Sequence, residues 1–138
     1  MGRKAAAFGI AAVAVLGMSS PASAEPVKGE AGVLASCPSS GYITSEKTCT
    51  TLSNGEVYHN RYGFSVETKY EKEGGSQIYR RLGVTVAGAN YYGSWGYQSS
   101  GTTSSKSWDI YNAGCKSGVG WVEVRDQGRF QTPPTPSC

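Results

Sequence analysis

One histidine is the residue on which acid–base or nucleophilic catalysis would depend in this chain. His59 is the single histidine among the 138 residues, so a Ser–His or Cys–His mechanism would need it. It lies in the stretch Tyr58-His59-Asn60-Arg61, which has the character of a strand, and the chain has no GxSxG turn. A lone histidine in a strand is more often structural than catalytic. We therefore expect no catalytic residue and no enzyme activity.

Carboxylates offer a second route to chemistry, through the acid and base pair of a glycoside hydrolase. Glu67, Glu71 and Glu73 are close in sequence, but the first two alternate with less polar positions and so belong to the solvated face of a strand. The chain has no DxDxDG loop, HExxH pair or cluster of cysteine and histidine that would indicate a metal site. We expect neither a metal nor another cofactor.

A cluster of aromatic residues is the strongest candidate for binding. Tyr91, Tyr92, Trp95 and Tyr97 lie close together in the sequence, and exposed aromatic rings can stack on sugars or anchor a protein partner. Strand alternation would place Tyr91, Trp95 and Tyr97 on one face, which is typical of a core strand. We therefore favour a buried Trp95 and assign the contact with a partner to Tyr92 on the opposite face.

The four cysteines predict two disulfides, because they are even in number and all lie beyond residues 1–24, which have the pattern of a secretory signal peptide. Three pairings of Cys37, Cys49, Cys115 and Cys138 are open to the chain. Short loops close with the smaller loss of entropy, which favours Cys37–Cys49 and Cys115–Cys138. Each of these bonds would stabilise the fold by about 3 kcal/mol.

The start of the chain has the pattern of a secretory signal peptide. Gly2-Arg3-Lys4 is basic, residues 5–17 are apolar or small, and Ala22-Ser23-Ala24 matches an A-x-A cleavage site. Residues 1–24 are therefore predicted to be removed on export. The mature protein is predicted to be secreted and extracellular.

The composition of residues 25–138 limits the kinds of partner. Without Arg3 and Lys4, 11 of the 13 basic side chains remain against 10 acidic ones, a net charge of +1. This balance predicts neither a nucleic-acid partner nor a membrane partner. Leu, Ile, Val and Phe are scarce, whereas the nine tyrosines and three tryptophans can each bury about 150–250 Å². The core is expected to be small, aromatic and supported by the disulfides.

Short alternating segments predict an all-β fold from Cys37 onward, since no segment of the mature chain shows a helical stripe. Three antiparallel pairs are expected, which join residues 66–71 with 78–86, residues 91–98 with 105–111, and residues 119–125 with 129–132. The predicted fold is a small antiparallel β-sandwich or barrel-like domain over residues 37–138. The proline-rich tail, residues 132–138, is expected to run extended over the surface.

Residues 25–36 are predicted to form a flexible N-terminal arm. They follow neither a strand period nor a helix period and contain one proline and two glycines. Their apolar content is too low for them to fold alone. If the arm docks in the groove of a partner, Val27, Val33 and Leu34 would be its anchors.

The layout of the chain resembles a family of small secreted proteins from filamentous bacteria. The shared features are the signal peptide, the short arm, Cys37-Pro38, the stretch from Thr48 to Gly55, and Phe130-Gln131-Thr132-Pro133-Pro134 followed by Cys138. On these features the chain is similar to the adaptor family of umbrella toxin particles. The resemblance covers nearly all of residues 25–138.

The resemblance implies a non-enzymatic adaptor in an antibacterial complex. In that family the adaptor links a large repeat-containing toxin protein to lectin subunits, and the particle inhibits hyphal growth of competitors. The adaptor's N-terminal segment would enter a cleft in a trypsin-like domain of the lectin, a role that falls on residues 25–36.

Two other functions remain open from the residues. One is a secreted proteinase inhibitor with a binding loop around residues 115–120, and the other is a carbohydrate-binding module that uses Tyr91, Tyr92 or Trp95. A small hydrolase is a weaker third alternative.

Overall fold

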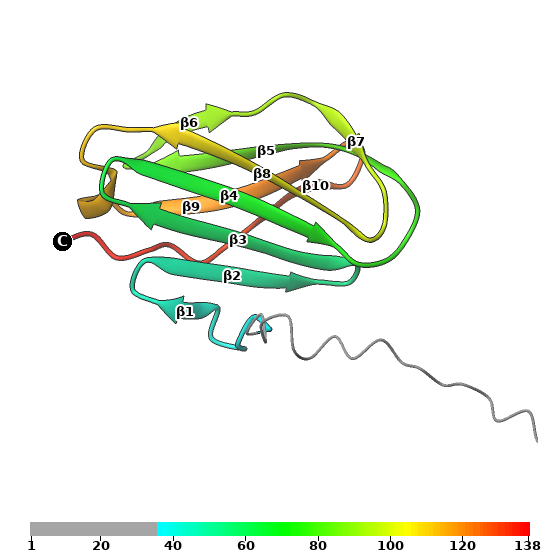
Figure 1. Ribbon diagram of the computed structural model, residues 1–138, viewed down its shortest axis with the longest axis horizontal. Helices are drawn as coiled ribbons and strands as arrows, with labels where there is room; N and C mark the ends of the chain where they lie inside the picture. Colours follow the sequence, from blue (N-terminus) through cyan, green and yellow to red (C-terminus); the bar gives the residue numbers. More distant parts are fainter. Residues whose placement is uncertain (1–35) are drawn as a thin grey trace, which may run out of the picture.

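The computed structural model describes residues 36–138 (Figure 1). The predicted signal peptide and nearly all of the predicted arm, including Val27, Val33 and Leu34, lie outside the described residues. Within residues 36–138 there is no helix long and apolar enough to cross a membrane. The elements are β1 (Tyr42–Thr44), β2 (Lys47–Leu52), β3 (Gly55–Tyr62), β4 (Ser65–Lys72), β5 (Ile78–Val86), β6 (Ala89–Tyr92), β7 (Gly96–Gln98), β8 (Thr102–Asp109), the short 3₁₀ helix η1 (Ala113–Cys115), β9 (Gly118–Val124) and β10 (Gly128–Gln131).

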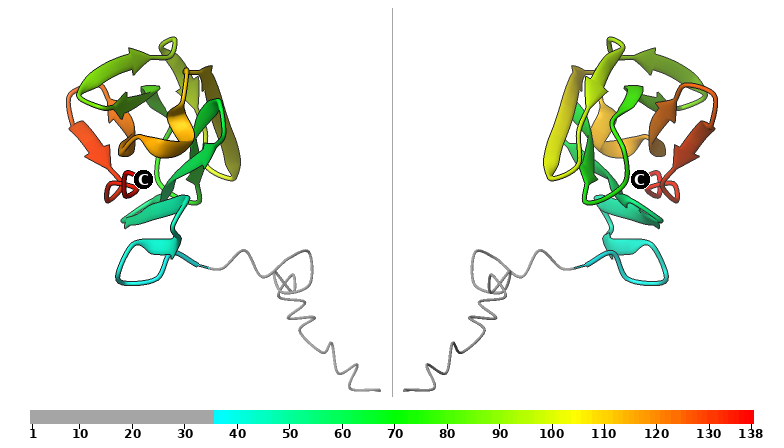
Figure 2. Two further views of the ribbon diagram at one scale, coloured as in Figure 1. Left: turned by 90° about the vertical axis from the view of Figure 1, so that its left-hand side faces the viewer. Right: turned by 90° about the vertical axis from the view of Figure 1, so that its right-hand side faces the viewer.

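The strands form two antiparallel sheets that lie one over the other (Figures 1 and 2). The first sheet has the order β1-β2-β3-β4-β8, and the second has the order β10-β9-β5-β6. Strand β7 also pairs with β5, beyond the end of β6. The expectation of a small all-β domain with antiparallel sheets is confirmed. We call the sheets the first sheet and the second sheet below.

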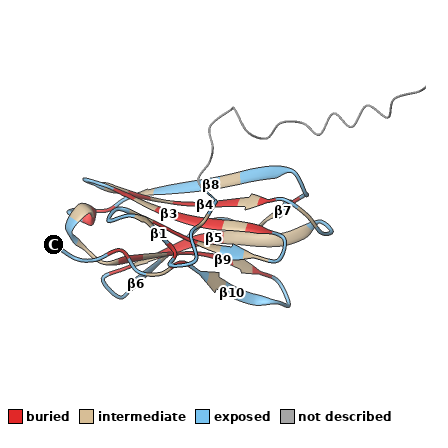
Figure 3. Cartoon of the chain, turned by 90° about the horizontal axis from the view of Figure 1, so that it is seen from below, coloured by how far each residue is buried: buried red, intermediate tan, exposed pale blue. Residues whose placement is uncertain are grey.

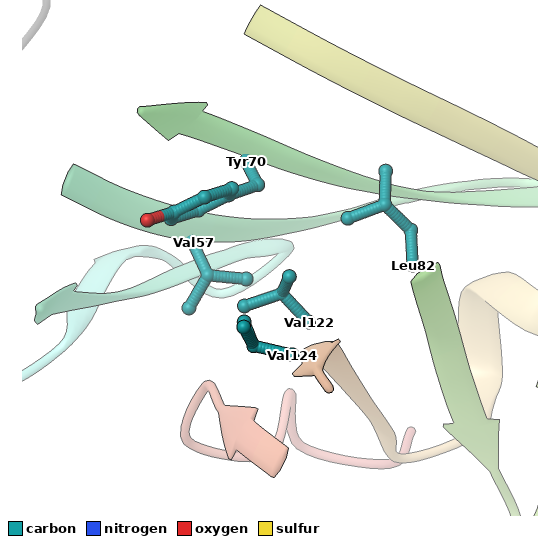
Figure 4. Close-up of a cluster of buried hydrophobic side chains, with 5 residues drawn as sticks. All are labelled: Val57, Tyr70, Leu82, Val122 and Val124. Atoms are coloured by element: carbon teal, nitrogen blue, oxygen red, sulfur yellow. The ribbon is translucent and has the colours of Figure 1, made fainter. Parts of the chain in front are cut away.

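The core lies between the two sheets because each contributes one apolar face. In β4 every second residue is buried, which turns Val66, Thr68 and Tyr70 inward. Figure 4 shows one cluster of core side chains, in which residues of β3 and β4 meet residues of β5 and β9. The buried residues gather where the layers face each other (Figure 3). The clusters are Val57, Tyr70, Leu82, Val122 and Val124 in one half, and Val66, Val84, Val86, Ile110 and Ala113 in the other.

The predicted hairpin between residues 66–71 and 78–86 is wrong. Strand β4 pairs with β3 and β8, whereas β5 pairs with β9, β6 and β7. The two strands therefore belong to different sheets, and residues 73–77 connect the layers. Alternation predicts that each strand has one face that must be buried. Two such strands can bury these faces either as neighbours in one sheet or as members of two stacked sheets. The sequence correctly predicted which residues of each strand point inward, but it did not predict which strands they pair with.

The second predicted pair is also wrong, and the third is confirmed. Residues 91–98 are not one strand, because the chain leaves the ladder between β6 and β7. Strand β8 crosses to the first sheet, where all eight of its residues pair with β4. Strands β9 and β10 form the expected pair, with Arg129 opposite Glu123 and Phe130 opposite Val122.

Both favoured disulfides are present. Cys37 is bonded to Cys49 of β2, and Cys115 at the end of η1 is bonded to Cys138. The first bond fastens the start of the domain to the first sheet. The second fastens the end of the chain beside the start of β9. No cysteine within residues 36–138 is free.

The C-terminal tail runs along the edge of β9, with Pro134, Pro136, Ser137 and Cys138 exposed at the surface as expected. The backbone N–H groups of Thr132 and Thr135 donate to the carbonyl oxygens of Gly120 and Gly118, each at 2.9 Å. The hydroxyl groups of the same two threonines accept from the N–H groups of Gly120 and Gly118, at 3.1 and 3.0 Å. Threonine side chains thus complete the ladder next to prolines, which have no N–H to donate. Both threonines are buried.

Replacing Thr135 with valine should lower the free energy of unfolding by about 1–3 kcal/mol, because the buried N–H of Gly118 would lose its acceptor. Urea unfolding followed by far-ultraviolet circular dichroism measures this. Thr103→Val, at an exposed position of β8, is the control and should change stability by less than about 0.5 kcal/mol. Equal stability of both variants would show that the tail does not close the sheet in this way.

Candidate functional site

The histidine lies in the core and not at the surface. His59 of β3 is fully buried and points toward the second sheet. A Cβ atom added at Gly118 would lie 2.7 Å from His59 Nε2, and one added at Gly120 would lie 2.8 Å from His59 Cβ. Neither ring nitrogen has a hydrogen bond of normal geometry within residues 36–138. His59 therefore fills the space that the two glycines of β9 leave open.

Burial sets the charge of this histidine. Transfer into the core lowers the pKa of His59 to about 4. The backbone of Glu67 opposes this change, and the nearby Arg61 guanidinium acts in the same direction as burial. The imidazole is thus neutral at pH 7. A base that no solvent or substrate reaches has no access to a reacting group.

Besides Tyr42 and Tyr62, the exposed aromatic side chains form two groups. Phe64 and Tyr111 are 70% and 83% exposed and lie with ring centroids 6.4 Å apart, near the turn between β3 and β4. A larger group covers the outward surface of the second sheet. We call this group the aromatic–arginine face, and it consists of Tyr79, Arg81, Tyr92, Trp95, Tyr97, Trp121, Glu123, Arg125 and Arg129.

Strand alternation builds this face. In β5 the residues Leu82 and Val84 point into the core, so Arg81 and Gly83, which alternate with them, point outward. In β9 the inward Val122 likewise leaves Trp121 and Glu123 outward. The pairing register then sets these residues in rows across the sheet. One row is Arg81–Glu123–Arg129, the next is Tyr92–Gly83–Trp121, and a third is Tyr97–Tyr79–Arg125.

Gly83 lets the indole of Trp121 lie flat on the sheet. A Cβ atom at this position would be 2.0 Å from two ring carbons of Trp121. The indole N–H donates to Thr85 Oγ1 at 3.2 Å, and Tyr92 meets the ring edge-on at a centroid distance of 5.3 Å. The Arg129 guanidinium covers the indole at 3.7 Å from its centroid. Trp121 is thus fully buried although it is on the outer surface of the sheet.

A second stack continues from Arg81 toward β7. The Arg81 guanidinium lies 4.4 Å from the ring centroid of Tyr92 and 4.9 Å from that of Trp95. Trp95 stacks on Tyr79 at 5.4 Å with an angle of 16° between the ring planes. Tyr79 also contacts Tyr97 at 4.7 Å and lies 5.0 Å from the Arg125 guanidinium. Rings and guanidinium groups therefore hold one another in place across the face.

The face carries a net positive charge. Glu123 Oε2 accepts from Arg81 Nε at 2.8 Å and lies 3.6 Å from a terminal nitrogen of Arg129. The hydrogen bond from Arg81 holds the pKa of the Glu123 carboxyl below its ordinary value. Three arginines and one carboxylate give the face a charge of +2 at pH 7. The sequence predicted no such concentration of charge, since residues 25–138 as a whole are nearly neutral.

The structure places the predicted aromatic residues on both sides of the second sheet. Tyr91 packs against the core, as expected. Tyr92 is 48% exposed and belongs to the aromatic–arginine face. Trp95 and Tyr97 were expected in the core, but they are 37% and 70% exposed. The expectation is wrong because residues 93–95 leave the sheet between β6 and β7, which breaks the alternation on which it rested.

Sequence reasoning missed Tyr79, Arg81, Trp121, Arg125 and Arg129 as members of one surface. A signal was present in the alternation, since outward positions are those between the core residues of β5 and β9. It could not be used without knowing that these strands are neighbours. The pairing of β5 with β9 joins residues about 40 positions apart, and no local pattern specifies it.

The loop considered for a proteinase inhibitor is anchored in the domain. The Lys116 carbonyl accepts from the Arg61 guanidinium at 3.2 Å, and Gly118 and Gly120 are buried within β9. Residues 115–120 therefore lack the exposed, extended backbone that a protease would bind. A hollow of about 620 Å³ lies between β1 and the tail, and its lining residues carry no charge. Residues 36–138 contain no group of three or more potential metal ligands.

Comparisons with protein-family models, curated proteins and solved structures returned no match to this chain.

Proposed function

We propose that this protein is a secreted, non-enzymatic adaptor that binds other proteins through its aromatic–arginine face. Its partners would be a large repeat-containing toxin protein and a lectin with a trypsin-like domain, joined in an antibacterial particle that inhibits the hyphal growth of competitors. The observation that carries the binding function is the aromatic–arginine face. The identity of the partners rests on the resemblance of the sequence.

The composition of the face supports a role in protein binding. Tryptophan, tyrosine and arginine are the residues that contribute most to binding energy at protein interfaces. Here they occur together, on the five strands of the second sheet and on two connections between them, and they stack on one another. Side chains that are already held in place lose little conformational freedom on binding. The face is thus organised before a partner arrives.

The covalent structure supports an extracellular location. Disulfides persist in oxidising compartments, and the two disulfides of this domain are compatible with an extracellular protein. The predicted signal peptide would provide the route of export. Buried His59, which has no solvent access, supports a function without catalysis.

A carbohydrate-binding module is the second candidate, because Trp95 and Tyr97 are exposed on a sheet surface. Sugars stack on free ring faces. The Arg81 guanidinium already lies over the rings of both Tyr92 and Trp95. These two rings therefore offer less free surface to a sugar, which favours a protein partner with polar groups.

Capture of partners from culture medium tests the proposed function. The mature protein, residues 25–138 with a C-terminal tag, is immobilised and incubated with medium of the producing organism under mild conditions. We expect stoichiometric recovery of a repeat-containing protein together with a lectin. If no partner is captured and the mature protein, applied as a free monomer, is retained on glycan columns, the result would instead support the carbohydrate-binding module.

A further inference from the structure

The geometry points to an acidic segment of a partner protein as the occupant of the aromatic–arginine face, and we propose that Arg81, Arg125 and Arg129 bind its carboxylates. This inference rests on the proposed function, because it names the chemistry of the partner at the same face. It commits to a polypeptide with Asp or Glu side chains among apolar ones.

The first argument is the number of donors without an acceptor. Each guanidinium group has five N–H donors, and Arg81 and Arg129 share a single carboxylate oxygen of Glu123. Arg125 has no ion pair within residues 36–138, and its guanidinium contacts the ring of Tyr79. Most donors of the three arginines are therefore free to meet acceptors from outside. Carboxylates match the planar guanidinium in two parallel hydrogen bonds.

The second argument is the fixed position of the guanidinium groups. Arg81 lies over Tyr92 and Trp95, and Arg129 lies over Trp121. Arginine can stack on a ring and still donate from its edge, which lysine cannot do in the same way. Arg81 and Arg129 stand on either side of Glu123 in one row, so their backbones are about 10 Å apart, two strand spacings. Two carboxylates of one segment can reach both.

The third argument is the contrast between the two outer surfaces. The outer surface of the first sheet carries the outward residues of β2, β3, β4 and β8. Its charged residues are Glu56, Glu67, Glu71, Asp109, Lys47 and Lys69, a net charge of −2, against +2 on the aromatic–arginine face. An acidic segment would thus be attracted to one side of the molecule and repelled by the other. Charge complementarity therefore favours an acidic segment as the occupant of the aromatic–arginine face.

The apolar part of the proposed occupant follows from the rings. Tyr92, Trp95 and Tyr97 are exposed between and beside the arginines. Apolar side chains of the segment would cover these rings while its carboxylates reach the guanidinium groups. A purely acidic polymer would leave the rings in water.

The test uses a synthetic 12-residue peptide with the repeat Asp-Leu-Glu-Ala and nuclear magnetic resonance of the mature protein. We expect the peptide to shift the Nε–Hε signals of Arg81, Arg125 and Arg129 and the indole signal of Trp95. The variant Arg125→Gln/Arg129→Gln should weaken peptide binding about tenfold or more. Lys47→Gln/Lys69→Gln on the opposite surface is the matched control and should leave the affinity within twofold.

Four results would overturn the inference. The first is the absence of shifts of these signals when the acidic peptide is added. The second is an equal effect of a neutral control peptide with the repeat Asn-Leu-Gln-Ala. The third is tighter binding of polygalacturonate than of the acidic peptide at the same residues, which would indicate an acidic polysaccharide. The fourth is a shift of these signals with protein concentration alone at low salt, which would identify a second copy of this chain.

The same variants separate this inference from the proposed function. If Arg125→Gln/Arg129→Gln retains the captured partners but Tyr92→Ala/Trp95→Ala loses them, the face binds proteins and the proposal of an acidic segment is wrong. If both of these variants retain the partners, the proposed function of the face fails as well.

Discussion

Acidification from pH 7 to pH 4 should remove about 3 kcal/mol of stability through His59 alone. Its pKa is lowered from 6.5 to about 4 in the folded protein, so the unfolded chain takes up the proton more readily. The stabilising contribution is complete above pH 6.5 and is lost as the pH falls toward 4. The lowering of the pKa from 6.5 to about 4 corresponds to about 3 kcal/mol of stability.

Urea unfolding at several pH values measures this contribution as the difference between the wild type and His59→Leu. The variant cannot titrate at this position, so its stability should fall less between pH 7 and pH 4. If the leucine variant does not fold, His59→Gln and a direct nuclear magnetic resonance titration of His59 take its place. Parallel stability curves, or a titration midpoint near 6.5, would show that His59 is not held neutral in the core.

Replacing Gly83 with alanine should destabilise the domain by about 3 kcal/mol and disrupt the aromatic–arginine face. The new Cβ atom would lie 2.0 Å from two ring carbons of Trp121, so the indole must leave its position. The ring would lose its hydrogen bond to Thr85 and its contacts with Tyr92 and Arg129. Overpacking and the loss of a buried aromatic ring each cost a few kcal/mol.

The control for Gly83→Ala is Gly63→Ala. A Cβ atom at Gly63 would meet no heavy atom within 4 Å, so this variant should match the wild type to within about 1 kcal/mol. Stability is measured by urea unfolding, and near-ultraviolet circular dichroism follows the environment of Trp121. A Gly83→Ala protein with unchanged stability and an unchanged aromatic spectrum would contradict the flat packing of Trp121 on β5.

The local features of the fold could be predicted from the sequence, but the pairing of distant strands could not. Alternation specified the inward residues of β4 and β5, and loop length specified both disulfides, since these depend on neighbouring positions. The partners of β4, β5 and β8 depend on which sheet each strand enters. Both arrangements bury the same side chains, so the pattern of residues is equally consistent with either.

The candidate site was predicted only through Tyr92. Trp95 was placed in the core because alternation was continued through residues 93–95, where the chain leaves the sheet. The burial of Trp121 at the outer surface had no signal in the sequence. It requires a glycine directly opposite on β5 and an arginine opposite Glu123 on β10, both of which are long-range contacts. Charge gave no indication, because basic and acidic residues separate onto opposite surfaces only in the folded domain.

The central claim is that the aromatic–arginine face, and not exposed aromatic surface in general, binds the partner protein. The chain provides a matched comparison, because Phe64 and Tyr111 form a second exposed aromatic pair elsewhere. The most direct measurement is the Kd of the captured partner for Tyr92→Ala/Trp95→Ala and for Phe64→Ala/Tyr111→Ala, with circular dichroism to confirm that each variant folds. We predict that the first variant raises the Kd at least about 30-fold, whereas the second changes it less than about twofold. A Kd that is unchanged in the first variant, or raised equally in both, would contradict the assignment of binding to this face.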